Sequence, residues 1–269
     1  MMVFPQLLTD LRAESAALDQ MIAGLSPQRW ERPTPAEGWA IRDQVSHLAY
    51  FDEAAVLAAT DPDAFRGHAR ELLALGPGFP DVIAARYRST SAEELLAWFR
   101  AARRNLLATF GELDPKARVP WFGPDMSVTS SATARLMETW AHGQDVADTV
   151  GVVREPTARL RHIAHLGVRT FGFSFQLHGL EVPETPVRVS LAAPGGDRWE
   201  WGPPTAADVV SGPALDFCLV VTQRRHLTDT RLRLKGQTAA EWLAIAQAFA
   251  GAPGPGRSAG KFAMDRGVA

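Results

Sequence analysis

Apolar residues recur at helical spacing through most of the first 180 residues, and this periodicity limits what the chain can fold into. Four segments show it, at 4–24, 40–60, 91–111 and 129–150. A helix of about 20 residues is about 30 Å long. Helices of that length are typical of a four-helix bundle, in which each helix buries one apolar face against its neighbours. The sequence therefore predicts a helical bundle over 1–180.

The pattern changes near residue 180. A fifth helical segment covers 156–178, and residues 186–192 then alternate between apolar and polar as a strand does, ahead of a Pro-Gly-Gly-Asp turn signal. Further short strands and a closing helix predict a small α/β domain over 181–252. The Gly-, Pro- and Ser-rich residues 253–269 are expected to form a flexible tail. The predicted fold class is α+β, with a helical bundle followed by a small α/β domain.

Charge and cysteine content exclude several classes of function. The formal net charge of -2 supplies no basic field for nucleic acid and no polybasic patch for a membrane surface. No apolar run approaches the roughly 18 residues of a membrane span, and the first residues lack a secretory signal pattern. The single cysteine, Cys218, fits a reducing compartment and lies among apolar residues, which predicts a core position. We expect a cytoplasmic protein, either a monomer or a homodimer.

Three side chains have the donor types and spacing of a metal site. Glu138 and His142 lie four residues apart, which places both on one face of a helix. His47 lies in another helical segment and would complete a three-ligand set with an open coordination position, as in catalytic sites. Asp145, three residues after His142, is a candidate catalytic residue that would orient a ligand imidazole or act on the substrate.

The spacing alone is weak evidence for a metal. A Glu-x3-His pair also arises by chance as a solvated polar face, and Asp145 would then form a surface ion pair. Apolar residues are interleaved with these polar positions: Trp140, Ala141, Val146 and Ala147. Polar groups beside a core stripe need partners, which favours the metal site.

Two segments carry a resemblance to a known family. PTPAEGWAIRDQVSHLAYFD contains a Trp and then Asp43, followed four residues later by His47. ETWAHGQDVADTVG contains the pattern Glu-x3-His-x2-Asp. Both resemble the signature regions of the mycothiol-dependent maleylpyruvate isomerase family, a branch of the DinB-like metal-binding bundles. The C-terminal part looks like the small sterol-carrier-like α/β module attached to these bundles.

The resemblance implies a DinB-like four-helix bundle that holds a divalent metal through His47, Glu138 and His142. Zn²⁺ is the favoured ion, and Ni²⁺, Mn²⁺ and Fe²⁺ also suit these donors. The resemblance further implies mycothiol as a cosubstrate, whose thiolate would serve isomerisation or S-transfer. Arg224 or Arg225, in SGPALDFCLVVTQRR, would hold a substrate carboxylate. The alternative for this arginine pair is an exposed helix end.

Other classes of function stay open. A metal-binding bundle could perform thiol-independent chemistry, as a hydrolase or a pathway-specific cyclase does, or could serve as a non-catalytic small-molecule-binding module. A metal enclosed by four protein ligands would favour the binding module, whereas an open position favours an enzyme. The expected partners are a small electrophilic substrate and a low-molecular-weight thiol, with neither nucleic acid nor a membrane.

Overall fold

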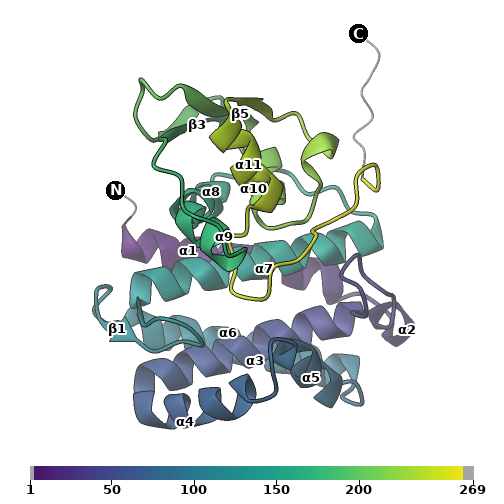
Figure 1. Cartoon of the computed structure of the whole chain (residues 1–269). Helices are drawn as coiled ribbons and strands as arrows, with labels where there is room; N and C mark the ends of the chain where they lie inside the picture. Colours follow the sequence, from purple (N-terminus) through teal and green to yellow (C-terminus); the bar gives the residue numbers. More distant parts are fainter. Residues whose placement is uncertain (1–2, 263–269) are drawn as a thin grey trace. The chain divides into compact units, whose positions relative to one another are not determined.

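Two units of different composition make up the chain in its computed structural model, which describes residues 3–262 (Figure 1). The first unit, Met1–Arg154, is almost entirely helical. The second, Glu155–Ala269, combines short helices with a four-stranded sheet. This combination confirms the predicted α+β fold class. Among the described residues, no helix is both long and apolar enough to cross a membrane.

The predicted domain limits, 1–180, 181–252 and 253–269, stay predictions, and the last seven of these residues lie outside the described ones. In the structure, helices α8 (Leu160–Arg169) and α9 (Phe171–Leu177) belong to the second unit. They replace the single helix expected over this stretch. Thr170 separates them, and its hydroxyl donates a hydrogen bond to the carbonyl oxygen of Gly167 at 3.0 Å, a local bond that competes with regular helix geometry.

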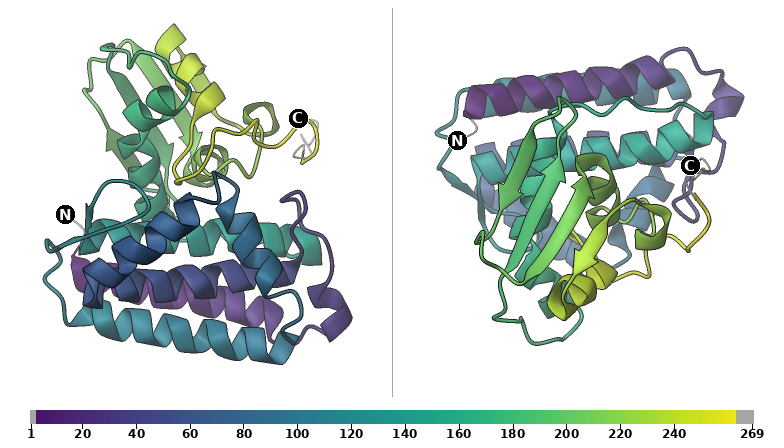
Figure 2. Two further views of the ribbon diagram at one scale, coloured as in Figure 1. Left: turned by 60° about the horizontal axis from the view of Figure 1, so that its bottom comes forward. Right: turned by 90° about the horizontal axis from the view of Figure 1, so that it is seen from above.

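Four long helices form the first unit and confirm the four predicted segments. They are α1 (Phe4–Ile22), α3 (Ile41–Thr60), α6 (Ala92–Gly111) and α7 (Val128–Val150). Helix α3 packs against α6 and α7, and α1 also packs against both, so the four close into a ring (Figures 1 and 2). Each buries an apolar face in the shared core, as the helical periodicity predicts.

Short elements connect the long helices: α2 (Pro27–Trp30), α4 (Pro62–Leu73), α5 (Phe79–Arg86), β1 (Arg118–Val119) and β2 (Met126–Ser127). The helix ends follow local rules. A capping box joins Ser91 and Glu94 at the start of α6, with the Glu94 N–H 3.2 Å from the Ser91 hydroxyl. Helix α7 ends at Gly151, whose φ of 77° lies in the left-handed region that favours glycine.

A buried network of ions and hydrogen bonds ties all four long helices together. Asp52 on α3 is fully buried and accepts hydrogen bonds from Arg103 on α6 at 2.6 and 3.1 Å, and from Arg135 on α7 at 3.0 Å. Arg103 also donates to Ser15 on α1 and to Thr139 on α7. Ions removed from water are tolerated only when they are paired, so these contacts restrict how the helices can pack.

The second unit is built around a mixed sheet of order β4-β3-β5-β6. Its strands are β3 (Val187–Ala192), β4 (Arg198–Trp201), β5 (Asp208–Pro213) and β6 (Arg233–Lys235), seen side by side in Figure 2. β3 pairs antiparallel with β4 through the predicted turn, and parallel with β5. β6 pairs antiparallel with β5 at the other edge.

The second unit also contains η1 (Leu227–Asp229) and α11 (Gln237–Ile245). Two of its other helices, α8 and α10 (Ala214–Val221), pack closely together. Helix α10 lies against α8 at Gly167, where a Cβ atom would come within 2.8 Å of Val221 Cγ2. Cys218 lies on α10, is fully buried, and donates its thiol hydrogen to the Leu160 carbonyl oxygen at 3.4 Å. Its core position confirms the prediction, and burial raises the pKa of its thiol.

We expect Asp52→Asn to destabilise the first unit by about 3–5 kcal/mol, because it leaves two buried guanidinium groups without a charge partner. Urea unfolding monitored by circular dichroism measures this change. The control is Asp19→Asn, which removes the exposed ion pair with Arg100 at 2.6 Å and should cost less than about 1 kcal/mol. Equal losses in the two variants would contradict a special role for the buried network.

We expect Cys218 to react with Ellman's reagent only as fast as the second unit opens, because the buried thiol does not ionise at neutral pH. The measurement compares thiol release from native protein with release in concentrated urea. Fast reaction of the native protein would show that α10 is not packed as described.

Candidate metal centre

The candidate site lies between the two adjacent helices α3 and α7. Three side-chain contacts join these helices in antiparallel order: Gln44 with His142, His47 with Glu138, and Asp52 with Arg135. The order matters because it brings residues that are about 90 positions apart in the chain onto facing surfaces. The predicted arrangement, in which a facing helix supplies His47 to the Glu138–His142 pair, is therefore present in the structure.

His47, Glu138 and His142 converge on one point, with one ligand atom of each lying within 4.8 Å of the others. Oε2 of Glu138 lies 3.1 Å from Nε2 of His142 and 3.7 Å from Nε2 of His47. The two imidazole rings are 4.4 Å apart between centroids. Two imidazole nitrogens and a carboxylate oxygen facing one another have the chemistry and spacing to hold a divalent metal ion, whose identity they leave open among several first-row metals.

The protonation states of these groups favour a cation. Burial, followed by the nearby His142, lowers the pKa of His47 to about 4, so its imidazole is neutral at pH 7. Burial by itself would raise the pKa of Glu138, but hydrogen bonds with His142 and His47 outweigh it and hold this pKa well below its usual range. A neutral imidazole and an ionised carboxylate are the forms in which these two side chains bind a metal.

Gln44 orients one of the imidazoles. Its side-chain oxygen accepts a hydrogen bond from Nδ1 of His142, which leaves Nε2 facing Glu138. The amide nitrogen of Gln44 donates to the Thr34 hydroxyl at 2.8 Å, and this bond fixes which end of the amide meets the imidazole. A partner on the outer nitrogen is the usual way in which proteins hold a ligand histidine. Sequence reasoning did not single out Gln44, although its position three residues before His47 places it on the same helix face.

Aromatic rings enclose the imidazoles. Trp39 stacks on His142 with 5.8 Å between ring centroids and lies 5.2 Å from His47. Its indole nitrogen donates to Asp81 Oδ1 at 2.7 Å, which holds the ring in place. Phe51 lies 4.6 Å from His47 between ring centroids and joins a larger aromatic cluster. These apolar surfaces limit water around the ligand atoms and so strengthen electrostatic interactions there.

Asp43, the acidic residue of the first motif, positions the start of α3. Its carboxylate accepts the Ala40 backbone N–H at 2.8 Å and a hydrogen bond from Arg88 at 3.1 Å. An acidic side chain in the first turn also interacts favourably with the helix dipole. Asp43 therefore fixes the end of the helix that carries Gln44 and His47.

The candidate residue Asp145 is fully buried on α7. Its burial is incompatible with the alternative of a surface ion pair. Its assignment as a catalytic residue stays a prediction.

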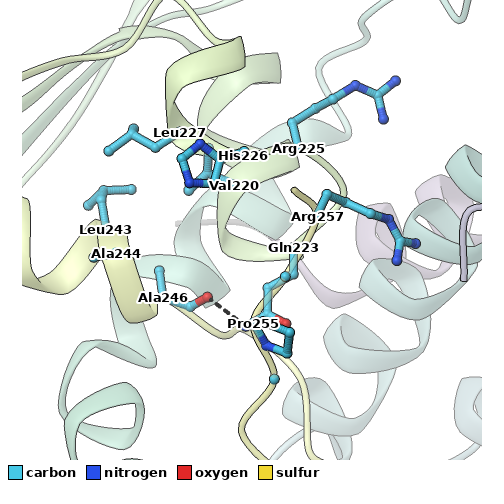
Figure 3. A pocket seen from close by; sticks show the side chains of 12 residues that line it. Val220, Gln223, Arg225, His226, Leu227, Leu243, Ala244, Ala246, Pro255 and Arg257 are labelled. Carbon is cyan, nitrogen blue, oxygen red and sulfur yellow. Dashed lines mark hydrogen bonds between the residues drawn. The ribbon is translucent and has the colours of Figure 1, made fainter. Parts of the chain in front are cut away.

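The two candidate arginines lie in the second unit, just after α10. Arg224 donates to the Thr222 carbonyl oxygen at 2.7 Å and Arg225 donates to the Arg224 carbonyl oxygen at 2.8 Å. Arg225 also lines a cavity of about 170 Å³, where its guanidinium group lies on the same side as that of Arg257 and opposite Leu243 (Figure 3). Their roles toward a substrate stay predictions.

This fold and these side chains define an α+β protein whose helical unit carries a candidate divalent-metal centre. Residues 11–147 match the sequence profile of the mycothiol maleylpyruvate isomerase N-terminal domain. The chain belongs to this family, which confirms the resemblance drawn from the two motifs.

Two relatives and two solved structures are also similar to this chain. Uncharacterized proteins from two strains of Mycobacterium tuberculosis are each 48% identical over 250 residues, which cover 93% of this chain and 97% of the relative. Two crystal structures of the mycothiol-dependent maleylpyruvate isomerase, one of a histidine-to-alanine mutant, superpose with TM-scores of 0.58 and 0.59. They share 16% identity and cover 83% of this chain and 90% of theirs, so they show a common fold.

We expect Gln44→Leu to weaken metal binding about 10- to 100-fold, because His142 loses the acceptor that orients it. Metal titration followed by calorimetry measures the affinity. The matched control is Gln144→Leu, which removes another largely buried amide whose partner is Asp148 at 2.8 Å. Equal affinities in the two variants would show that Gln44 does not orient a ligand.

Proposed function

We propose that this protein is a divalent-metal-dependent enzyme that activates a low-molecular-weight thiol for isomerisation or S-transfer on a small electrophilic substrate. The convergence of His47, Glu138 and His142 within 4.8 Å carries the proposal. We propose Zn²⁺ as the ion and mycothiol as the thiol, the latter because the structural neighbours are named for dependence on it. The proposed location of this activity is the cytoplasm.

The number of protein ligands supports an enzyme rather than a closed structural site. Within residues 3–262, the cluster contains three side chains of the kinds that bind metals. Structural zinc sites use four protein ligands, whereas catalytic sites use three and leave a position for water or substrate. A bound divalent ion would stabilise the thiolate form of an added thiol at neutral pH.

The chain's own residues would prepare this chemistry. Neutral His47 and ionised Glu138 are in the charge states that bind a metal, and Gln44 keeps Nε2 of His142 directed at the same point. Trp39 and Phe51 cover the imidazoles and exclude water, which prolongs the life of a reactive thiolate. We assign Asp145 to the orientation of ligands or substrate, and Arg224 or Arg225 to a substrate carboxylate.

Removing any one of His47, Glu138 and His142 should abolish both metal retention and thiol binding. The experiment purifies wild type and the three alanine variants without a metal-affinity step and measures metal content. Each protein is then loaded with Co²⁺ and titrated with mycothiol, because thiolate coordination produces a new charge-transfer absorption band. Isomerisation of maleylpyruvate is measured in parallel.

His68→Ala is the matched control, since His68 also lies in the first unit but bonds to the Tyr50 hydroxyl at 2.5 Å and lies outside the cluster. It should keep metal and thiol binding. Normal metal content in His47→Ala or Glu138→Ala would show that the ligand set is wrong. A Co²⁺ spectrum that no thiol changes would instead indicate thiol-independent chemistry.

A further inference from the structure

The two arginines of the buried network differ in one respect. Every side-chain nitrogen of Arg103 has an acceptor: Nε and Nη2 bond to Asp52, Nη1 bonds to Ser15, and Nη2 also bonds to Thr139. Arg135 bonds to Asp52 through Nε at 3.0 Å. Its Nη2 atom is buried and has no hydrogen-bond partner among residues 3–262.

An unused guanidinium nitrogen in a protein interior is costly. The side chain of Arg135 is only 3% exposed, so solvent cannot easily satisfy it. A buried donor without an acceptor destabilises the protein by the full free energy of its removal from water, and this free energy is larger for charged groups. Such an atom calls for an acceptor that the protein itself does not supply, which is the feature expected of a ligand-binding donor.

Arg135 lies next to the candidate metal centre. It precedes Glu138 by three residues on α7, which places the two side chains on the same helix face, one turn apart. Its partner Asp52 lies on α3, five residues beyond His47, so the ion network is the next contact along the same helix pair. The charge of Arg135 also reaches His47, where it contributes to lowering the pKa of that imidazole.

Charge balance indicates what kind of acceptor fits. Asp52 and Glu138 are the carboxylates of the ion network and the metal cluster, and they equal the two guanidinium groups in number. A divalent ion at the candidate centre would add two positive charges to this set of groups. A thiolate on the ion would neutralise one of them, and one further negative charge within reach of Arg135 would neutralise the other.

We infer that Nη2 of Arg135 is an anion-binding donor that takes a carboxylate oxygen of a small ligand bound at the adjacent metal centre. This inference rests on the proposed function for the ion and adds a binding residue within the bundle itself. Arg135 thereby has two roles: its Nε donates to Asp52, and its Nη2 donates to the ligand. A guanidinium group suits this task because its nitrogens lie in a fixed, planar array.

The test compares three small thiols of similar size that differ in charge. Co²⁺-loaded wild-type protein is titrated with mercaptoacetate, 2-mercaptoethanol and 2-mercaptoethylamine, and binding is followed by the thiolate absorption band. We expect mercaptoacetate to bind about 10- to 100-fold more tightly than 2-mercaptoethanol, the range of a hydrogen bond to a charged group. 2-Mercaptoethylamine should bind most weakly. An ammonium thiol that binds as tightly as mercaptoacetate would overturn the inference without needing any variant.

Variants separate the arginine from chelation of the ion by the carboxylate. Arg135→Lys keeps a positive charge but lacks Nη2, and it should lose most of the preference for mercaptoacetate. Arg103→Lys is the matched control: it disturbs the same ion network and should keep the preference. A preference that survives unchanged in Arg135→Lys would show that it arises from chelation, and that a water molecule satisfies Nη2. If Arg135→Lys does not fold, Arg135→Gln replaces it: loss of the preference in Arg135→Gln supports the inference, and an unchanged preference overturns it.

The outcomes also separate this inference from the proposed function. Thiols that bind equally well regardless of charge would refute the anion-binding role of Arg135 and leave thiol activation standing. If no thiol binds, thiol activation is wrong, and Co²⁺-loaded wild type, Arg135→Lys and Arg103→Lys are titrated with acetate alone. Acetate binding that is lost only in Arg135→Lys would still support the inference, and its absence from wild type would overturn it.

Discussion

One buried carboxylate, that of Asp52, holds the helical unit in the arrangement on which the candidate centre depends. It pairs with Arg103 on α6 and Arg135 on α7, and so ties both helices to α3. Apolar side chains can slide past one another at modest cost, but an ion left unpaired in the interior costs several kcal/mol. A shift of α7 along α3 by one turn would break these bonds, so the network fixes the register that places Glu138 opposite His47.

The same burial that makes this network costly prepares the neighbouring cluster for a cation. Removing His47 from water favours its neutral form, while hydrogen bonds from both histidines keep Glu138 ionised. Ring contacts with Trp39 and Phe51 and the hydrogen bond from His142 to Gln44 thus hold the imidazoles in place before a metal binds. A site organised in this way loses little conformational freedom when it binds a metal, which favours high affinity.

Much of the fold could be predicted, because helical periodicity is a local signal that each segment carries in its own residues. The four long helices followed from helical spacing, and the strand at 186–192 followed from the alternation of apolar and polar residues. The break at Thr170 did not, since a stretch of helical pattern does not show whether one residue will leave helical geometry. Domain limits are similarly hard to place, because they depend on which elements pack together and not on the composition of the chain.

In the candidate centre, too, local spacing could be predicted and contacts between distant segments could not. Glu138 and His142 are paired by their spacing on one helix, His47 was proposed as the third donor from a second helical segment, and the motif resemblance added the family. Gln44 was within reach of the same spacing argument, but an amide has no distinctive signature in a sequence. The ion network with Asp52 at its centre had none at all, because its three members come from three helices far apart in the chain.

By itself, the sequence determined the helices, the donor types and the pair of ligands on a single helix face, since all of these depend on neighbours within a few residues. Only the tertiary structure decided that α3 runs antiparallel to α7, with His47 facing Glu138 and Gln44 bonded to His142. It also decided that Nη2 of Arg135 is buried without a hydrogen-bond partner among residues 3–262. These are matters of register between distant segments. Register is set by the packing of whole helices and by the pairing of buried charges, which no local pattern contains.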